Sequence, residues 1–207
     1  TNEDTNWDDQ FWDVLEVSQN NQQSYIQART MKTHFYTCTF MESRLFLDNK
    51  EVITECNNKQ LEKYTSFTYQ QEIKQNQTFT IHKFGGYLVD RNHKKDELVA
   101  AAKEALDKAV SFGFDALLEL QKQSWAQIWK MSDITIEGDV KAQQGIRFNI
   151  FQLNQTYLGT DVTLNIGPKG FTGEKYGGST YWDTEAYCIP FYMATKDQSV
   201  ARKLLEY

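Results

Sequence analysis

The residues with the clearest capacity for chemistry lie at positions 164–185, which read LNIGPKGFTGEKYGGSTYWDTE. The five glycines of this stretch permit left-handed backbone angles and let a ligand approach the backbone closely. After them, Trp182 and Asp183 place a flat apolar ring beside a carboxylate that accepts hydrogen bonds. A sugar has an apolar ring face and several hydroxyl groups, so this pair suits a sugar. The stretch therefore predicts a shaped loop that ends in a carbohydrate-binding pair.

Asp183 also has a purely structural interpretation. Thr180 lies three residues before it, which is the spacing of a helix capping box, and in that motif Asp183 would accept backbone N–H bonds. Spacing alone favours this capping role over a ligand role. Asp183 and Glu185 cannot act as the two carboxylates of a glycosidase, because side chains two residues apart on a helix point about 200° away from one another. We therefore expect Glu185 to support packing, and Glu174 to be a solvated loop carboxylate.

The sequence supports neither a nucleotide site nor a metal site. GPKGFTGEK has only a superficial likeness to a phosphate-binding loop, since no Gly-Lys-Ser/Thr follows at the required spacing and no GxGxxG is present. His34 and Cys38 would share one face of a strand, but a zinc site needs further ligands. His82 and His93 stand alone in the sequence. We therefore expect no bound metal.

Strands are the expected elements of the first part of the chain. From residue 25 to residue 90 the sequence is rich in Thr, Tyr, Phe and Ile, and its alternating pieces are YIQARTMKT, TCTFMESRLFL and KYTSFTYQQEI. This pattern predicts antiparallel strands separated by turns. Within FTIHKFGGYLVD, the glycines Gly85 and Gly86 lie between apolar positions and predict a bulge or a bend.

Helices are expected after Asp90. KKDELVAAAKEALDKAVSFGF has apolar residues at three- and four-residue spacing, which predicts an amphipathic helix interrupted at Gly113. FDALLELQKQSWAQIWKMS predicts a second helix, in which we expect Trp125 and Trp129 to belong to the core. A strand-like DITI and a turn at Gly138 precede a third helix over residues 141–158.

Arg147 is the one basic residue of this third helix with a candidate role. It lies beside Phe148 and follows a polar start of the helix. Its guanidinium either reaches an active-site carboxylate or stabilises the helix surface, and the residues alone favour the surface role.

Composition and charge limit the class of protein. The 207 residues are 40% hydrophobic and 24% charged, as in a globular protein, and 14% are aromatic, a share that a sugar-binding surface could use. A net charge of −6 without a run of Lys or Arg argues against a nucleic-acid surface. No apolar stretch approaches the roughly 20 residues of a membrane span, and the polar start TNEDTNWDDQ lacks the features of a secretion signal. Three widely spaced cysteines cannot complete a disulfide framework, so a cytoplasmic setting is the simpler expectation.

The C-terminal third also carries a family resemblance. QQGIRFNIFQLNQTYLGTDVTLNIGPKGFTGEKYGG (residues 143–178) followed by YWDTEAYCIPFYMAT (residues 181–195) resembles the maltose phosphorylases of glycoside hydrolase family 65, most densely over residues 143–194. The resemblance implies part of an antiparallel β-sandwich over residues 1–90, a helical linker over 91–138, and the first helices of an (α/α)6 barrel over 139–207. Because enzymes of this family are several times longer, it also implies that the chain is a fragment. The end at KLLEY, inside a helical pattern without a C-cap, fits that expectation.

The same resemblance implies a function. The family reaction would be inverting phosphorolysis of maltose to β-D-glucose 1-phosphate and glucose, with inorganic phosphate as co-substrate and no organic cofactor. Trp182 and Asp183 would hold the non-reducing glucose, which reverses the balance in favour of the ligand role. The expected pocket wall is Tyr176, Gly177, Gly178 and Arg147.

Several expectations follow for the fragment itself. The general acid would lie beyond Tyr207, so the fragment alone would be inactive, and the parent would be a homodimer. Alternatives are a family member that acts on trehalose, kojibiose or nigerose, by phosphorolysis or hydrolysis, because the residues that choose the linkage would lie outside the chain. A non-catalytic carbohydrate-binding module is a further alternative.

Overall fold

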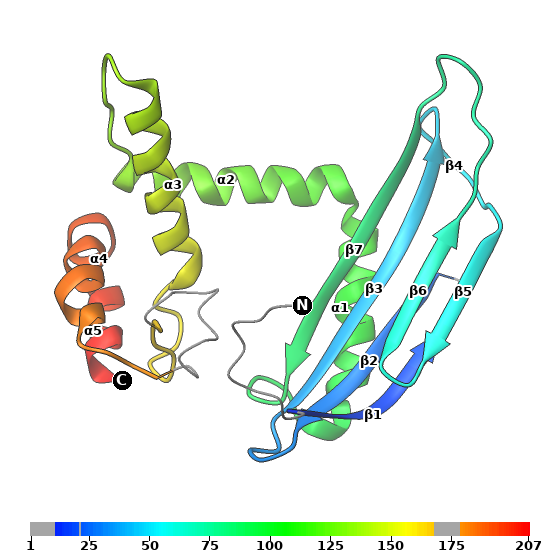
Figure 1. Ribbon diagram of the computed structural model, residues 1–207, viewed down its shortest axis with the longest axis horizontal. Helices are drawn as coiled ribbons and strands as arrows, with labels where there is room; N and C mark the ends of the chain where they lie inside the picture. The colour runs from blue at the N-terminus through cyan, green and yellow to red at the C-terminus, as the bar shows by residue number, and fades with distance from the viewer. Residues whose placement is uncertain (1–10, 21, 168–178) are drawn as a thin grey trace, which may run out of the picture. The chain divides into compact units, whose positions relative to one another are not determined.

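The computed structural model describes residues 11–20, 22–167 and 179–207, in which antiparallel strands are followed by helices (Figure 1). This order confirms the predicted fold class of β structure followed by α structure. The described residues divide into two compact units, a sheet unit that ends at Glu119 and a helical unit that begins at Leu120.

A five-stranded antiparallel sheet forms the frame of the sheet unit. The long strand β3 lies at its centre, because it pairs with β2 and β4 along one edge and with β7 along the other, while β1 pairs with β2. The Thr, Tyr and Phe residues of these segments suit a pleated surface with one buried face. The strands are β1 (Trp12–Gln19), β2 (Gln23–Thr30), β3 (Tyr36–Leu47), β4 (Lys50–Glu51) and β7 (Phe79–Val89).

The predicted bulge at the diglycine of β7 is wrong. The register between β3 and β7 runs without a shift from the Thr37–Val89 pair to the Leu47–Phe79 pair. A Cβ atom on Gly86 would lie 3.3 Å from the Phe40 ring, so the glycine allows this ring to pack closely against the β7 backbone. The shift in the sheet occurs in β1, between Val14 and Glu16. The glycines therefore serve close packing within a regular ladder.

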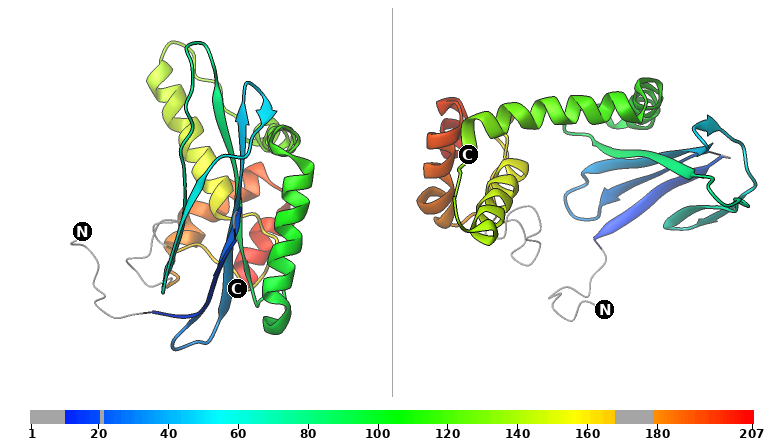
Figure 2. Two further views of the ribbon diagram at one scale, coloured as in Figure 1. Left: turned by 90° about the vertical axis from the view of Figure 1, so that its right-hand side faces the viewer. Right: turned by 90° about the horizontal axis from the view of Figure 1, so that it is seen from above.

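A second, two-stranded hairpin lies on one face of the sheet, and a helix covers the other. The hairpin consists of β5 (Cys56–Leu61) and β6 (Tyr64–Tyr69), and its Thr65 hydroxyl lies 3.1 Å from that of Ser24 in β2. The next residue of β2, Tyr25, has the ammonium group of Lys103 over its ring. Because adjacent strand residues point to opposite faces, the hairpin and the helix that carries Lys103 lie on opposite faces of the sheet (Figure 2).

This helix, α1 (Leu98–Phe112), follows a short 3₁₀ turn, η1 (Lys95–Glu97), and packs on β3 and β7. Its buried residues are Leu98, Ala102 and Leu106, which confirms the predicted amphipathic stripe. Leu98 and Ala102 pack with the fully buried Cys38 of β3 in one core cluster. The helix ends at Gly113, which has a φ of 79°, as the glycine interruption predicts.

The second helix, α2 (Phe114–Ser132), has the predicted range but a less buried apolar stripe than expected. Ser132 is its only buried residue, and Trp125 and Trp129 are half-buried, so the prediction that these tryptophans belong to the core is wrong. Trp125 stacks on Phe151 of the third helix with 4.9 Å between the ring centroids. Trp125 therefore joins two helices at a partly exposed contact.

The third helix, α3 (Val140–Thr156), begins at the predicted turn. Asp139 caps it, since its carboxylate accepts a hydrogen bond from the Ala142 N–H at 3.0 Å. The preceding DITI segment forms no strand, because the side chain of Gln143 takes hydrogen-bonding groups of its backbone. The Gln143 side chain accepts a hydrogen bond from the Ile136 N–H at 2.6 Å and donates one to the Ile134 carbonyl at 2.9 Å. The predicted strand at this position is therefore wrong.

The remaining helical elements in the described part of this unit are a π-turn, η4 (Thr184–Cys188), and the helices α4 (Ile189–Thr195) and α5 (Gln198–Glu206). Their buried apolar residues form a core cluster with two residues that follow α3; its members are Tyr157, Ile166, Ile189, Tyr192, Val200, Ala201 and Leu204. None of the helices in the described ranges combines the length and the apolar character needed to cross a bilayer.

Candidate functional site

Trp182 and Asp183 lie at the start of the helical stretch formed by η4 and α4, as the sequence predicts. The Trp182 side chain is 71% exposed, and Asp183 and Glu185 are exposed as well. An exposed indole next to an exposed carboxylate is able to stack on a sugar ring and to accept hydrogen bonds from its hydroxyl groups.

The described residues give the capping interpretation of Asp183 no support. Asp183 occupies the position before η4, but its backbone is already helical, with φ −57° and ψ −31°, and its side chain makes no capping hydrogen bond. In a capping box the acidic residue stands on a helical backbone, so the missing hydrogen bond, and not the backbone angles, argues against the capping role. Within the residues that the structure describes, the Asp183 carboxylate therefore makes no capping hydrogen bond that would compete with a ligand.

Thr184 anchors the pair to the interior of the unit. Its side chain is buried, and its hydroxyl donates to the backbone carbonyl of Ile166 at 3.0 Å. Ile166 itself is buried in the core cluster. Because Ile166 precedes and Thr184 follows residues 167–183, this one hydrogen bond fixes both ends of the segment that contains the candidate pair.

Tyr192 anchors the helix that follows. It is fully buried, and its hydroxyl donates to the Leu153 carbonyl of α3 at 2.7 Å. The Tyr157 ring packs edge-on against it, with 5.7 Å between centroids. Burial, which disfavours the phenolate, raises the pKa of Tyr192 well above its ordinary value. Tyr192 is therefore a neutral hydrogen-bond donor that ties α4 to α3.

Helix α5 contributes Val200, Ala201 and Leu204 to the same cluster. Asp197 caps it by accepting from the Ser199 N–H at 2.9 Å. Gly159, with a φ of 68°, lies against Val200: a Cβ atom there would come within 2.9 Å of Val200 atoms. Lys203 donates to the Gly159 carbonyl at 2.8 Å. Specific close contacts thus hold α5 and the residues around Gly159 in the core cluster that anchors the Trp182–Asp183 pair.

Arg147 forms an ion pair with Asp133. Its Nε and Nη2 atoms lie 2.9 Å and 2.6 Å from the two carboxylate oxygens of Asp133. The hydrogen bonds from Arg147 hold the pKa of Asp133 below its ordinary value. This partner supplies the surface-stabilising role that the residues favour. The placement of Arg147 in a pocket wall stays a prediction.

The other predicted pocket-wall residues, Tyr176, Gly177 and Gly178, lie outside the described residues, as does Glu174. His34 and Cys38 do not share a strand face: His34 lies in the turn before β3, with a φ of 54°, and Cys38 is buried in the core. In the described part of the chain, no three His, Cys, Asp or Glu side chains gather closely enough to hold a metal ion.

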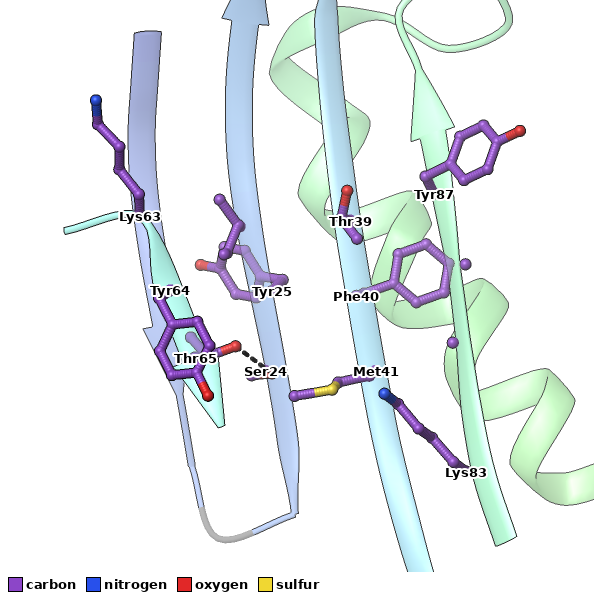
Figure 3. Close-up of a pocket in the computed structure, with 13 residues that line it drawn as sticks. Ser24, Tyr25, Thr39, Phe40, Met41, Lys63, Tyr64, Thr65, Lys83 and Tyr87 are labelled. Carbon is purple, nitrogen blue, oxygen red and sulfur yellow. Dashed lines mark hydrogen bonds between the residues drawn. The ribbon is translucent and has the colours of Figure 1, made fainter. Parts of the chain in front are cut away.

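The sheet unit also carries a groove that was not predicted from the sequence. It has a volume of about 580 Å³ and lies on the sheet face opposite α1, where Thr39, Met41, Lys83 and Tyr87 line it (Figure 3). The Tyr87 side chain is 66% exposed. The period-two spacing of residues 81, 83, 85 and 87 is the signal that could have identified this face.

Comparison with known families accounts for most of the chain. Residues 1–128 match the glycosyl hydrolase family 65 N-terminal domain, and residues 147–207 match the glycosyl hydrolase family 65 central catalytic domain. The two matches fall in the β-rich first part and in the helical part that carries Trp182 and Asp183, respectively.

Individual relatives agree with these matches. The maltose phosphorylase of Bacillus subtilis strain 168 is 39% identical over 206 residues, which are 100% of this chain and 27% of that protein. The α,α-trehalose phosphorylase of Thermoanaerobacter brockii is 33% identical over 94% of this chain and 24% of its own length. A solved structure from the human microbiome, assigned provisionally as a kojibiose phosphorylase, superposes with a TM-score of 0.77 at 26% identity, over 95% of this chain and 25% of that one.

The chain spans about a quarter of the length of the curated relatives it matches. The N-terminal domain match alone covers more than half of the chain, and the catalytic domain match includes the Trp182–Asp183 pair. The chain therefore belongs to glycosyl hydrolase family 65.

Proposed function

We propose that these residues are part of an inverting disaccharide phosphorylase that converts maltose and phosphate to β-D-glucose 1-phosphate and glucose. The observation that carries this proposal is the exposed Trp182–Asp183 pair, which stands on an anchored helix start and, among the described residues, has no capping role. Similarity to the maltose phosphorylase of Bacillus subtilis, 39% identical over the whole chain, supports maltose as the substrate.

The reaction requires one acid and one nucleophile. A phosphate oxygen attacks the anomeric carbon on the face opposite the leaving group, and the new C–O bond forms as the glycosidic C–O bond breaks. A protein carboxylic acid protonates the departing glycosidic oxygen, so glucose leaves as a neutral alcohol. Phosphate thus replaces the water that a second carboxylate activates in an inverting hydrolase.

The described residues contribute binding and orientation to this reaction. The Trp182 indole would stack on the non-reducing glucose, and the Asp183 carboxylate would accept hydrogen bonds from its hydroxyl groups. Fixing this ring sets the anomeric carbon in line between phosphate and leaving group, which lowers the entropic part of the barrier.

The general acid and the phosphate site are assigned to residues outside these 207. The coverage of only about a quarter of the relatives' length supports this division. On this proposal the 207-residue chain alone is inactive, and the complete enzyme works in the cytoplasm, where the free cysteines Cys38, Cys56 and Cys188 stay reduced.

The test is phosphate-dependent release of glucose 1-phosphate from maltose, measured with this chain and with the product of the complete reading frame. Trehalose, kojibiose and nigerose serve as competing substrates in parallel assays. Activity on maltose, confined to the longer protein, is the expected result. Preference for another disaccharide would reassign the substrate, and hydrolysis without phosphate would refute phosphorolysis.

Non-catalytic carbohydrate binding is the second candidate function. The groove beside Tyr87 favours it, because this exposed ring and the neighbouring Lys83 and Thr39 could contact a sugar chain. Calorimetric titration of the 207-residue chain with maltose tests it. Binding that disappears in Tyr87→Ala and persists in Asp183→Ala would favour the groove, and the reverse pattern would favour the Trp182–Asp183 pair.

A further inference from the structure

The turn that follows Asp183 contains one residue more than an α-helical turn. The Ile189 N–H donates to the Thr184 carbonyl, five residues back, whereas an α-helix would use the carbonyl four residues back. Pro190 supplies a physical cause. It follows immediately in the first turn of α4, where its ring would clash with the carbonyl of Ala186, four residues back, if the helix continued unbroken.

The extra residue decides which side chains face the core. Ile189 is buried in the core cluster. In an unbroken α-helix, residues four and seven positions before it would share its face, because each residue turns about 100°. Those residues are Glu185 and Trp182, so an α-helical turn would direct both toward the apolar core.

The structure shows the opposite distribution. Thr184, five positions before Ile189, is only 6% exposed, whereas Glu185 and Trp182 are exposed. An α-helical turn would point Thr184 roughly 140° away from Ile189 and break its hydrogen bond to the Ile166 carbonyl. The extra residue of the π-turn thus rotates the preceding residues about the helix axis by the angle of one residue, about 100°, and so turns Trp182 outward.

Two independent constraints therefore hold the same turn. Pro190 acts from the C-terminal side, because its ring would clash with the Ala186 carbonyl in an unbroken α-helix, and the Thr184–Ile166 hydrogen bond acts from the N-terminal side. We propose that Pro190 and Thr184 are positioning residues for substrate binding: together they keep the extra residue in the turn and so present Trp182 and Asp183 to the non-reducing glucose. This inference rests on the proposed function.

The experiment is a double-mutant cycle in the product of the complete reading frame. The variants are Thr184→Val, Pro190→Ala and their combination, with Thr184→Ser as the version that keeps the hydroxyl. Thr195→Val is the matched control, because the Thr195 hydroxyl also bonds a backbone carbonyl, that of Phe191 at 2.8 Å, at the far end of α4. The KM for maltose, the KM for phosphate, kcat and the melting temperature are measured for each variant.

The expected signature is a loss of maltose binding that exceeds the product of the single effects. Thr184→Val should raise the KM for maltose about tenfold and Pro190→Ala about threefold, while the combination raises it on the order of 100-fold, because either constraint alone partly preserves the turn. Thr184→Ser and Thr195→Val should stay within about twofold of the unmodified protein. The KM for phosphate should change less than the KM for maltose in every variant.

Two results would overturn the inference. One is a Thr184→Val effect on the maltose KM no larger than that of Thr195→Val, and the other is a combination that only multiplies the single effects. If the combination fails to fold, the contrast between Thr184→Val and Thr184→Ser decides alone. Asp183→Ala in the same assay distinguishes failure of the proposed glucose site from failure of the positioning role. If Asp183→Ala leaves the KM for maltose and kcat unchanged, the glucose site itself is refuted. If Asp183→Ala impairs the enzyme but Thr184→Val does not, only the positioning role is refuted.

Discussion

The sheet unit and the helical unit present their exposed aromatic side chains in two different ways. Tyr87 lies on a regular strand, where alternation alone turns it away from α1 while its neighbour Leu88 packs against the helix. Trp182 lies before a π-turn and is turned outward by an irregular hydrogen bond, a proline and a buried threonine. The first arrangement follows from the repeat of the strand, and the second depends on a few specific contacts. Single substitutions near Trp182 should therefore disturb function more than substitutions near Tyr87.

Removing the Asp183 carboxylate is the largest expected effect on this comparison. Asp183→Ala in the complete protein should lower kcat/KM for maltose about 10³-fold, since it removes charge-assisted hydrogen bonds to the sugar. Circular dichroism should show an unchanged fold, because the side chain is exposed and, among the described residues, makes no capping bond. Glu185→Ala and Tyr87→Ala are the controls and should keep activity within about twofold. Near-normal phosphorolysis by Asp183→Ala would contradict the expectation that function depends more on the residues near Trp182 than on those near Tyr87.

Substitution of Gly159 tests the packing of the core cluster that anchors the Trp182–Asp183 pair. Gly159→Ala should lower the free energy of unfolding by about 3 kcal/mol, because the residue has a positive φ and the new Cβ atom would meet Val200. Gly138→Ala is the matched control: its φ is 86°, but no atom lies within 4 Å of the added Cβ, so about 1 kcal/mol is expected. Urea unfolding of both variants measures the difference. Equal effects would show that the contact with Val200 contributes little.

The sheet unit is tested by the pH dependence of its core. Burial between β3 and α1 raises the pKa of Cys38 from 9.0 to about 11. Because the folded state keeps the proton more tightly, this contribution to stability is complete below pH 9 and is lost as the pH rises to 11. The free energy of unfolding should therefore fall between pH 8 and pH 11 by on the order of 2 kcal/mol more in the unmodified chain than in Cys38→Ala. Parallel pH profiles for the two proteins would contradict the burial of a neutral thiol.

The smallest effect is expected at Arg147. Its ion pair with Asp133 is exposed, and such pairs contribute little because water and salt screen them. Arg147→Ala should leave the urea midpoint nearly unchanged, as should Arg202→Ala, which breaks the exposed pair with Glu206. A large loss of maltose turnover in Arg147→Ala alone would instead support its predicted place in the pocket wall.

Regular elements of the fold could be predicted from the sequence, and elements held by side chains could not. The three- and four-residue spacing around Leu98 and Leu106 identifies α1, and alternation identifies β3 and β7. The DITI segment has the composition of a strand, but the Gln143 side chain takes its backbone hydrogen bonds. The predicted boundaries after residues 90 and 138 stay predictions.

The candidate site divides in the same way. The Trp182–Asp183 pair and the helix that it opens could be predicted from the residues, because a glycine-rich loop followed by an aromatic–acidic pair is visible in the sequence. The π-turn could not, since an i to i−5 hydrogen bond leaves no periodic pattern. Pro190, inside a helical stretch, was the available signal. The hydrogen bond from Thr184 to Ile166 joins residues 18 positions apart, and the two residue types give no signal that predicts it.

The most direct test of the central claim is a crystal structure of the complete protein with glucose bound. The account predicts that the Trp182 indole lies against the sugar ring, that the Asp183 carboxylate accepts hydrogen bonds from its hydroxyl groups, and that the Thr184–Ile166 bond is intact. Glucose bound elsewhere, with Asp183 bonded only to protein atoms, would contradict the account.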